Sequence, residues 1–365
     1  MKYLLNPNVH DLNPYQPGRP IEEIQRIYDL KQVIKLASNE NPLPVPETVA
    51  DAISKEISHI NLYPDSDSYY LKHRLAEYNG VDADNIIVGA GSVEIIRMIV
   101  GTFLCPGQTV LTSEKTFLMY KISAVEMGGK SACVEAPMGD DYTYDLETLY
   151  RLTDDKTKII FIANPNNPTG TLLPKQALTD FIGKIPEDKI IVLDNAYQEY
   201  VENMDNYADG IEEALNRKNI VVLRTFSKIY SLSGLRVGYA ISNPELISYL
   251  NRVKPPFNVT RIGQAAALAS LDNEDFKNYS AKINLINRKK LFRQLREMDV
   301  KVIPSETNFL MFFPRTDPLE LNQQLLKEGV IIRPLKAFGA PEALRVTVGT
   351  EEDNDFFIEK LRKVL

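Results

Sequence analysis

The 365-residue sequence contains few of the side chains that form disulfides or bind metals. Its two cysteines, Cys105 and Cys133, are too few for a disulfide framework or a metal-knuckle pattern, so we expect two reduced thiols. The three histidines, His10, His59 and His73, show no HExxH-like spacing. The sequence therefore gives little support to metal catalysis, and we expect no metal.

Long apolar runs and clusters of basic residues are also lacking. No stretch reaches about 18 consecutive apolar residues, and the apolar run within MKYLLNPNVH (1–10) is too short for a secretory signal. The formal net charge is -7, and no basic cluster marks a nucleic-acid-binding surface. We therefore expect a cytoplasmic protein that binds neither membranes nor nucleic acids.

The apolar residues that are present predict two domains around a large core. They make up 44% of the chain, and strand-like apolar runs alternate with helical segments up to about residue 258. This alternation predicts an α/β domain over 30–258, with a mainly parallel sheet flanked by helices. Beyond it, 259–365 predicts a smaller α+β domain, which an N-terminal arm, 1–29, joins. The predicted strands of the large domain are 86–90, 109–113, 158–164, 189–196 and 219–225.

One polar segment, RTFSKIYSLSGLRVGY (224–239), follows the last of these strands. In parallel sheets, ligands bind outside the carboxyl ends of the strands. Hydroxyl groups and a guanidinium bind phosphate oxygens, and a lysine held among polar groups condenses with aldehydes. Pyridoxal 5'-phosphate carries both a phosphate and an aldehyde, so the segment indicates a site for this cofactor. The residues that would bind it are Thr225, Ser227, Lys228 and Arg236. The alternative is an ordinary loop with a solvated lysine.

Glycines before a predicted helix indicate a further contact with phosphate. In VGAGSVEII (88–96), free N–H groups of Gly91 and Ser92 at the helix start are able to bind an anion, although the glycines also fit a simple tight turn. The segment lacks the full GxGxxG spacing of dinucleotide sites. A dehydrogenase is therefore disfavoured.

Other strand ends supply groups that suit the ring of the same cofactor. Asn167, in NPNNPTG (164–170), is able to donate to an anionic phenolic oxygen, and the carboxylate of Asp194 would keep a pyridine nitrogen protonated. Phe117 is placed to stack on the ring. Each residue also has a purely structural explanation: Asn167 as part of a proline-rich turn, Asp194 as a helix cap, and Phe117 as a core aromatic side chain.

Together these motifs resemble those of the fold-type I pyridoxal-phosphate aminotransferases, most closely the histidinol-phosphate aminotransferase family. The matching pieces span most of the chain in the order that the family has them. They are YQPG (15–18), ASNENP (37–42), LYPD (62–65), GAGSVEII (89–96), NPNNPTG (164–170), LDNAYQEY (193–200), 224–239, TNFLMF (307–312), IIRP (331–334) and LRVTVGT (344–350).

The resemblance implies a homodimer with active sites near the subunit interface. Lys228 would bind the cofactor covalently, Asp194 would pair with the ring nitrogen, and Tyr197 would join Asn167 at the phenolic oxygen. The phosphate would be held by Thr225, Ser227, Arg236, Gly91, Ser92 and Tyr63 of the partner subunit. The substrate pocket would include Tyr15, Asn41, Asn308, Arg333 and Arg345.

The resemblance also implies the reaction, in which L-histidinol phosphate, a phosphorylated amino alcohol, gives its amino group to a 2-oxo acid, 2-oxoglutarate, in histidine biosynthesis. Three positions depart from the family pattern: Val93, Lys115 and the pair Pro44-Val45. These departures affect the expected loop geometry and fine substrate preference.

The alternative functions are an aromatic amino acid aminotransferase, a threonine-phosphate decarboxylase-like enzyme, and a cofactor-binding interaction module without activity.

Overall fold

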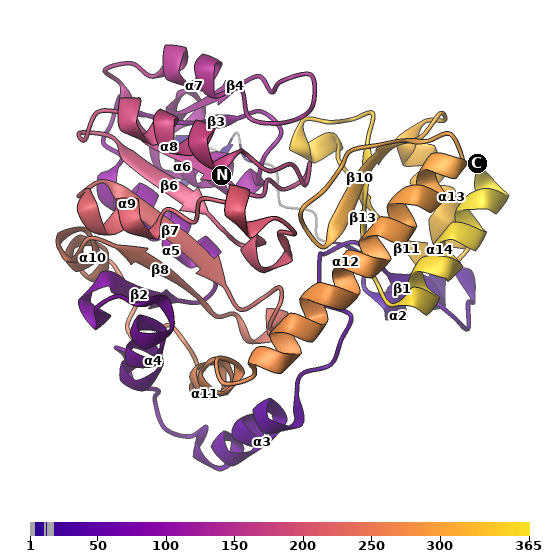
Figure 1. Ribbon diagram of the computed structural model, residues 1–365, viewed down its shortest axis with the longest axis horizontal. Helices are drawn as coiled ribbons and strands as arrows, with labels where there is room; N and C mark the ends of the chain where they lie inside the picture. The colour runs from indigo at the N-terminus through magenta and orange to yellow at the C-terminus, as the bar shows by residue number, and fades with distance from the viewer. Residues whose placement is uncertain (1–3, 11, 13–17) are drawn as a thin grey trace.

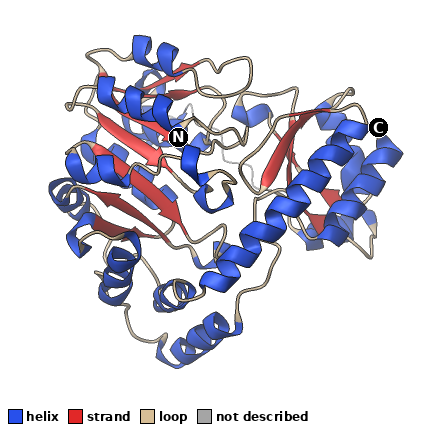
Figure 2. Cartoon of the chain, viewed as in Figure 1, coloured by secondary structure: helices blue, strands red, loops and turns tan. Residues whose placement is uncertain are grey.

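The computed structural model describes residues 4–10, 12 and 18–365 and shows two sheet-containing parts side by side (Figure 1). Figure 2 shows the strands gathered in two groups, with helices around each group. The larger part holds a seven-stranded, mostly parallel sheet, and the smaller part holds a four-stranded antiparallel sheet. The predicted fold class is therefore confirmed. Among the described residues, no helix has the length and apolar character needed to cross a membrane.

The large sheet has the strand order β2-β8-β7-β6-β5-β3-β4, in which β8 alone runs antiparallel to its neighbours. Its central strands are buried along their whole length, because helices cover both faces of the sheet. The edge strand β4 and the antiparallel β8 lie outside the five predicted runs. The strands are β2 (Ile86–Gly89), β3 (Thr109–Ser113), β4 (Cys133–Ala136), β5 (Thr157–Ala163), β6 (Ile190–Asp194), β7 (Ile220–Thr225) and β8 (Gly238–Ser242).

Alternate side chains of these strands point to opposite faces, and each face packs into its own apolar core. One core is completed by α4 (Tyr69–Asn79), α7 (Leu146–Leu152), α8 (Lys175–Lys184), α9 (Ile211–Asn216) and α11 (Arg261–Ser270), with α3 (Glu47–Glu56) packed on α11. The other core is completed by α5 (Ser92–Phe103), α6 (Leu118–Gly128) and α10 (Pro244–Asn251). The short α1 (Pro7–His10) contacts α6.

The small sheet has the order β12-β13-β10-β9, and long helices pack on one of its faces. A separate parallel pair joins β1 to β11, so residues near the N-terminal side of the chain contribute to this part. The strands are β1 (Ile34–Lys35), β9 (Lys301–Val302), β10 (Phe309–Phe313), β11 (Val330–Ile331), β12 (Arg333–Pro334) and β13 (Leu344–Thr347). The helices are α12 (Glu274–Glu297), α13 (Pro318–Lys327), α14 (Glu351–Val364) and α2 (Ile21–Tyr28), which packs on α13.

The long helical region over 261–297 is interrupted by a turn. Helix α11 ends at Ser270, and α12 begins at Glu274 after a turn. Asn273 occupies the position before α12, and acidic Glu274 and Asp275 follow in its first turn, where they interact favourably with the helix dipole. The predicted domain boundaries stay predictions, since α11 packs on the large part and β1 pairs within the small part.

Gly238, at the start of β8, lets α5 begin close to the large sheet. A Cβ atom at this position would lie 2.6 Å from the backbone nitrogen of Ser92 and 2.9 Å from the carbonyl carbon of Gly91. Both are backbone atoms, so neither moves aside without shifting the helix. Glycine at position 238 therefore fixes the distance between the sheet and the first turn of α5.

We predict that Gly238→Ala destabilises the fold by about 1–3 kcal/mol, the usual cost of overpacking. The matched control is Gly183→Ala in α8, where an added Cβ meets no atom within 4 Å. That change should stabilise the protein by roughly 0.5–1 kcal/mol, because alanine favours helix. Thermal unfolding of both variants measures the difference, and equal melting temperatures would contradict the packing argument.

Candidate active site

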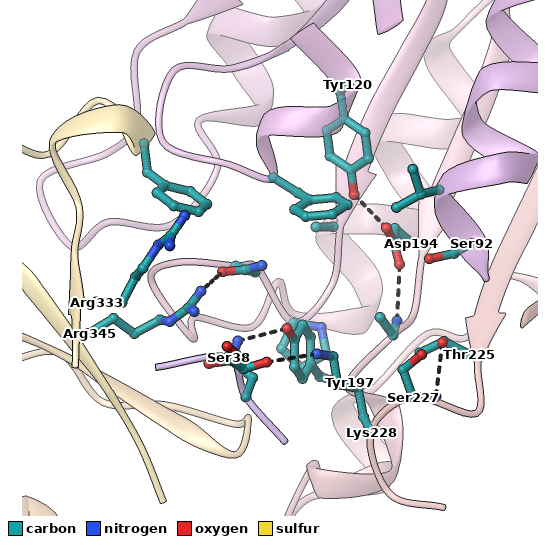
Figure 3. A pocket seen from close by; sticks show the side chains of 18 of the residues that line it. Ser38, Ser92, Tyr120, Asp194, Tyr197, Thr225, Ser227, Lys228, Arg333 and Arg345 are labelled. Carbon is teal, nitrogen blue, oxygen red and sulfur yellow. Dashed lines mark hydrogen bonds between the residues drawn. The ribbon is translucent and has the colours of Figure 1, made fainter. Parts of the chain in front are cut away.

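A cavity lies between the carboxyl ends of β5, β6 and β7 and the small part of the molecule (Figure 3). The cavity, together with the open space at its mouth, encloses about 830 Å³. Most of the predicted site residues lie on its wall. They are Ser92, Phe117, Asn167, Asp194, Tyr197, Thr225, Ser227, Lys228, Arg236, Arg333 and Arg345.

Lys228 follows β7 and carries its amine into this cavity. Its Nζ donates a hydrogen bond to the backbone oxygen of Ser38 at 3.3 Å and lies 5.6 Å from the centre of the Tyr197 ring. Burial lowers the pKa of the Lys228 amine to about 8, and the nearby Arg345 and Arg236 cations act in the same direction. A substantial fraction of this amine is therefore neutral and nucleophilic near neutral pH.

Asp194, at the end of β6, is a buried carboxylate with two hydrogen-bond donors. Tyr120 donates its hydroxyl to Oδ2 at 2.7 Å, and the backbone N–H of Ala196 donates to Oδ1 at 3.1 Å. Burial raises the pKa of Asp194, while both hydrogen bonds and the charge of Lys228 oppose the shift. These hydrogen bonds thus partly offset the free-energy cost of keeping the buried Asp194 carboxylate charged.

Tyr197 and Asn167 are each oriented by a residue from elsewhere in the chain. Asn39 donates its side-chain amide to the Tyr197 hydroxyl at 2.8 Å. Arg345 donates to the side-chain oxygen of Asn167 at 2.6 Å, which directs the amide nitrogen of Asn167 away from this arginine. Both residues therefore present polar groups of fixed orientation.

At another side of the cavity, hydroxyls, a guanidinium and a helix N-terminus come together. Arg236 donates to the Ser227 hydroxyl at 3.1 Å, and the backbone N–H of Ser227 donates to the Thr225 hydroxyl at 3.1 Å. Helix α5 begins at Ser92, directly after Gly91 with a φ of 79°. Because glycine tolerates this left-handed conformation, the chain turns here without strain, and a Cβ atom would collide with the Arg236 guanidinium. The group suits an anion such as phosphate.

The small part contributes two buried arginines, which stand opposite each other on neighbouring strands. Arg333 on β12 is paired in register with Arg345 on β13. Both guanidinium groups lie near the ring of Phe338, with distances of 5.6 and 5.8 Å from the ring centre. Arg345 also donates to the backbone oxygen of Ala37 at 2.8 Å. Two buried cations on paired strands favour an anionic ligand.

Three other predicted residues that the structure describes lie away from this wall. Asn41 and Asn308 line a smaller, second cavity, and their amides donate to backbone oxygens of Ile229 at 2.8 Å and of Asn39 at 3.0 Å. Tyr63 is 78% exposed and stacks on Phe257 with ring centres 4.5 Å apart. Tyr15 falls outside the described residues. Their substrate or cofactor contacts stay predictions.

Sequence reasoning missed Tyr120, Asn39 and Phe338 as site residues. Tyr120 lies one helical turn after Phe117, and the two rings meet edge to face at 5.6 Å, so their spacing was a usable signal. Asn39 stands in the quoted segment 37–42, but its partner is far along the chain. For Phe338 the sequence offers no comparable signal.

Comparison with known proteins gives a consistent result. Residues 31–361 match the family model described as "Aminotransferase class I and II". The sequence is 43% identical to the histidinol-phosphate aminotransferase of Anaeromyxobacter sp. (strain Fw109-5), over 99% of each chain. It is 41% identical to that of Moorella thermoacetica, over 97% of this chain and 91% of the other. Among solved structures, histidinol-phosphate aminotransferase from Sinorhizobium meliloti in complex with pyridoxal-5'-phosphate has a TM-score of 0.88 and 26% identity, covering 99% of this chain and 98% of that one.

We predict that Lys228 is labelled at lower pH than an ordinary lysine. A lowered pKa means that the neutral amine predominates above pH 8, whereas a free lysine side chain stays charged up to about pH 10.4. Reductive methylation of the ligand-free protein with formaldehyde, read by peptide mass spectrometry, should rise through a midpoint near pH 8. A lysine peptide in the same tube is the reference. A Lys228 midpoint equal to that of the reference would contradict the burial argument.

Proposed function

Because this chain belongs to the class I and II aminotransferases, we propose that it uses pyridoxal 5'-phosphate to transfer an amino group from L-histidinol phosphate to 2-oxoglutarate. The products are imidazole-acetol phosphate and L-glutamate, in a step of histidine biosynthesis. High similarity to histidinol-phosphate aminotransferases over nearly the whole chain supports this assignment. The observation that carries it is one cavity that gathers the Lys228 amine, the Asp194 carboxylate and two buried arginines.

The donor groups of the cavity fit this cofactor. Thr225, Ser227, Arg236 and the first turn of α5 suit its phosphate, and the lack of a side chain at Gly91 lets the Arg236 guanidinium approach that turn closely. Asp194 suits the ring N–H, and Phe117 supplies an aromatic face in the same cavity. When bound, pyridoxal 5'-phosphate supplies an aldehyde that reacts with amines and a ring that accepts electrons from the substrate carbon.

In this proposal Lys228 both anchors the cofactor and moves the proton. With a pKa of about 8, its Nζ accepts a proton from the amine-bearing carbon of the substrate and gives one back at neutral pH. Ser38 holds Nζ through its backbone oxygen, so the amine remains inside the cavity.

Arg333 and Arg345 would recognise the anionic ends of both substrates. A guanidinium binds a phosphate ester or a carboxylate with two parallel hydrogen bonds, so the same pair serves the donor and the 2-oxo acid. Phe338, whose ring lies near both cations, places an apolar surface beside them. Each proposed substrate combines a small carbon skeleton with at least one anionic group, which matches a cavity wall that offers two cations beside an apolar ring.

We also propose that the protein is a homodimer in which Tyr63 of the partner subunit contacts the cofactor phosphate. Tyr63 is 78% exposed in the single chain, and nearby Ile57, Ile60 and Leu62 are also exposed. A group of exposed apolar side chains this close together is typical of an interface. The stacking of Tyr63 on Phe257 gives the ring a defined position from which its hydroxyl reaches outward.

We further propose a cytoplasmic location. Cys105 is exposed and Cys133 is partly buried, and neither forms a disulfide. Free thiols are typical of proteins from reducing compartments. A biosynthetic aminotransferase acting on soluble metabolites suits the same location.

The substrate assignment predicts a preference in the first half of the reaction. The cofactor-loaded protein is mixed with L-histidinol phosphate, L-phenylalanine or L-phosphothreonine without any oxo acid, and the cofactor absorbance is followed. We expect L-histidinol phosphate to react at least about 10-fold faster than phenylalanine, because a phosphate ester carries more negative charge than a carboxylate and each charge-assisted hydrogen bond to it is worth about 1.5–3 kcal/mol. Lys228→Ala, the control, should show no turnover.

Each alternative gives a different result in the same experiment. Faster reaction of phenylalanine would favour an aromatic amino acid aminotransferase. Release of carbon dioxide from phosphothreonine would favour a decarboxylase. A cofactor spectrum that no amine changes would favour an interaction module without activity.

The dimer proposal predicts a sedimentation mass near twice the chain mass of 41.3 kDa. Tyr63→Phe should leave this mass unchanged and weaken cofactor affinity by about 10-fold, because a hydroxyl donor to phosphate is lost. Tyr279→Phe changes another exposed tyrosine, on α12, and should leave the affinity unchanged. A monomer, or unchanged affinity in the Tyr63 variant, would contradict the proposal.

A further inference from the structure

Tyr120 is a completely buried tyrosine whose hydroxyl is directed at a functional carboxylate. It lies in the first turn of α6, and its ring stacks on Phe161 of β5 with centres 4.5 Å apart and an interplanar angle of 7°. Its hydroxyl donates to Oδ2 of Asp194 at 2.7 Å (Figure 3). A phenol in an apolar core needs such a partner, but many buried tyrosines meet a backbone oxygen instead.

The position of Asp194 makes this hydrogen bond consequential. Without donors, burial would favour the neutral carboxylic acid, which does not pair with a protonated ring nitrogen. Tyr120 donates to one carboxylate oxygen, and the N–H of Ala196 donates to the other. Because burial and the carboxylate raise the pKa of Tyr120 well above its usual value, this hydroxyl keeps its proton and acts as a donor throughout the physiological range.

The surroundings also fix the direction of the bond. The Tyr120 ring is held between the stacked Phe161 and the edge-to-face Phe117, so the hydroxyl has little freedom to turn away. Asp194 itself lines the cavity. Anchoring the carboxylate from α6 therefore sets the angle at which it faces a ligand.

We propose that Tyr120 is a positioning residue, which holds Asp194 ionised and oriented toward the ring nitrogen of pyridoxal 5'-phosphate. The proposal rests on the proposed function only for the identity of the cofactor. In this role Tyr120 acts through Asp194 on one atom of the ligand, the ring nitrogen. Loss of the Tyr120 hydroxyl should therefore leave the affinity for a ligand without that nitrogen unchanged.

The test compares the affinity of the cofactor-free protein for pyridoxal 5'-phosphate and for its carbocyclic analogue, in which a C–H group replaces the ring nitrogen. Tyr120→Phe should weaken binding of pyridoxal 5'-phosphate by about 10-fold or more, as expected for the loss of a hydrogen bond to a charged group. Binding of the analogue should change by less than about twofold. Isothermal titration of both ligands gives the ratio directly.

Tyr207→Phe is the matched control. Tyr207 is also buried, and its hydroxyl donates to the backbone oxygen of Asn164 at 3.1 Å rather than to Asp194. This variant should affect the two ligands equally. Should Tyr120→Phe unfold, 3-fluorotyrosine at position 120 keeps the shape and strengthens the donor, so it should tighten binding of pyridoxal 5'-phosphate alone by a few-fold.

The outcomes separate this proposal from the proposed function. Equal weakening of both ligands by Tyr120→Phe, or no weakening, would overturn the positioning role, and so would an unchanged ratio in the fluorinated protein. Failure of the wild-type protein to bind pyridoxal 5'-phosphate would instead overturn the proposed function, and the role of Tyr120 with it. A different preferred amino substrate would leave the role of Tyr120 intact.

Discussion

The parallel hydrogen-bond ladder of β5, β6 and β7 determines where the chemistry of this protein takes place. Ala163 pairs with Asp194, and Asp194 pairs with Leu223, so the three strands end at one edge of the sheet. The loops that follow them carry Asn167, Tyr197 and Lys228 to the same cavity. The side chains of Asn167 and Tyr197 are buried at this edge, and that of Lys228 is partly buried. Their interactions are correspondingly stronger than at a surface.

The segment Ala37–Asn39 connects the buried arginines of the small part to the cavity residues of the large part. Arg345 from the small sheet donates to the backbone oxygen of Ala37, and the side chain of Asn39 donates to Tyr197 of the large part. The backbone N–H of Asn39 in turn donates to the hydroxyl of Thr347 at 3.0 Å. The arginines are therefore held at a fixed place relative to Lys228. A change in this segment would alter the position of Arg345 and also that of Lys228, because the backbone oxygen of Ser38 accepts a hydrogen bond from the lysine amine.

Much of this arrangement could be predicted from sequence because its signals are local. The runs that became β5, β6 and β7 are continuous and apolar, and the groups that follow them are adjacent in the chain. Short edge strands such as β4, with partly exposed side chains, give no such signal. Tyr120 was missed as a site residue for a different reason, because its partner Asp194 is 74 residues away. Asn39 is 158 residues from Tyr197, and only the folded chain relates the two.

Burial and the charges around the cavity together set the proton affinity of the Lys228 amine. Burial lowers its pKa, Arg345 and Arg236 lower it further, and the carboxylates of Glu40 and Asp194 oppose the shift. The two arginine cations that add to the effect of burial on the pKa of Lys228 also attract anions. A bound anion neutralises part of that charge, and a neighbouring negative charge always favours the protonated amine. Anion binding and proton affinity at Lys228 are therefore linked, so that an anion bound in the cavity raises the pKa of this amine.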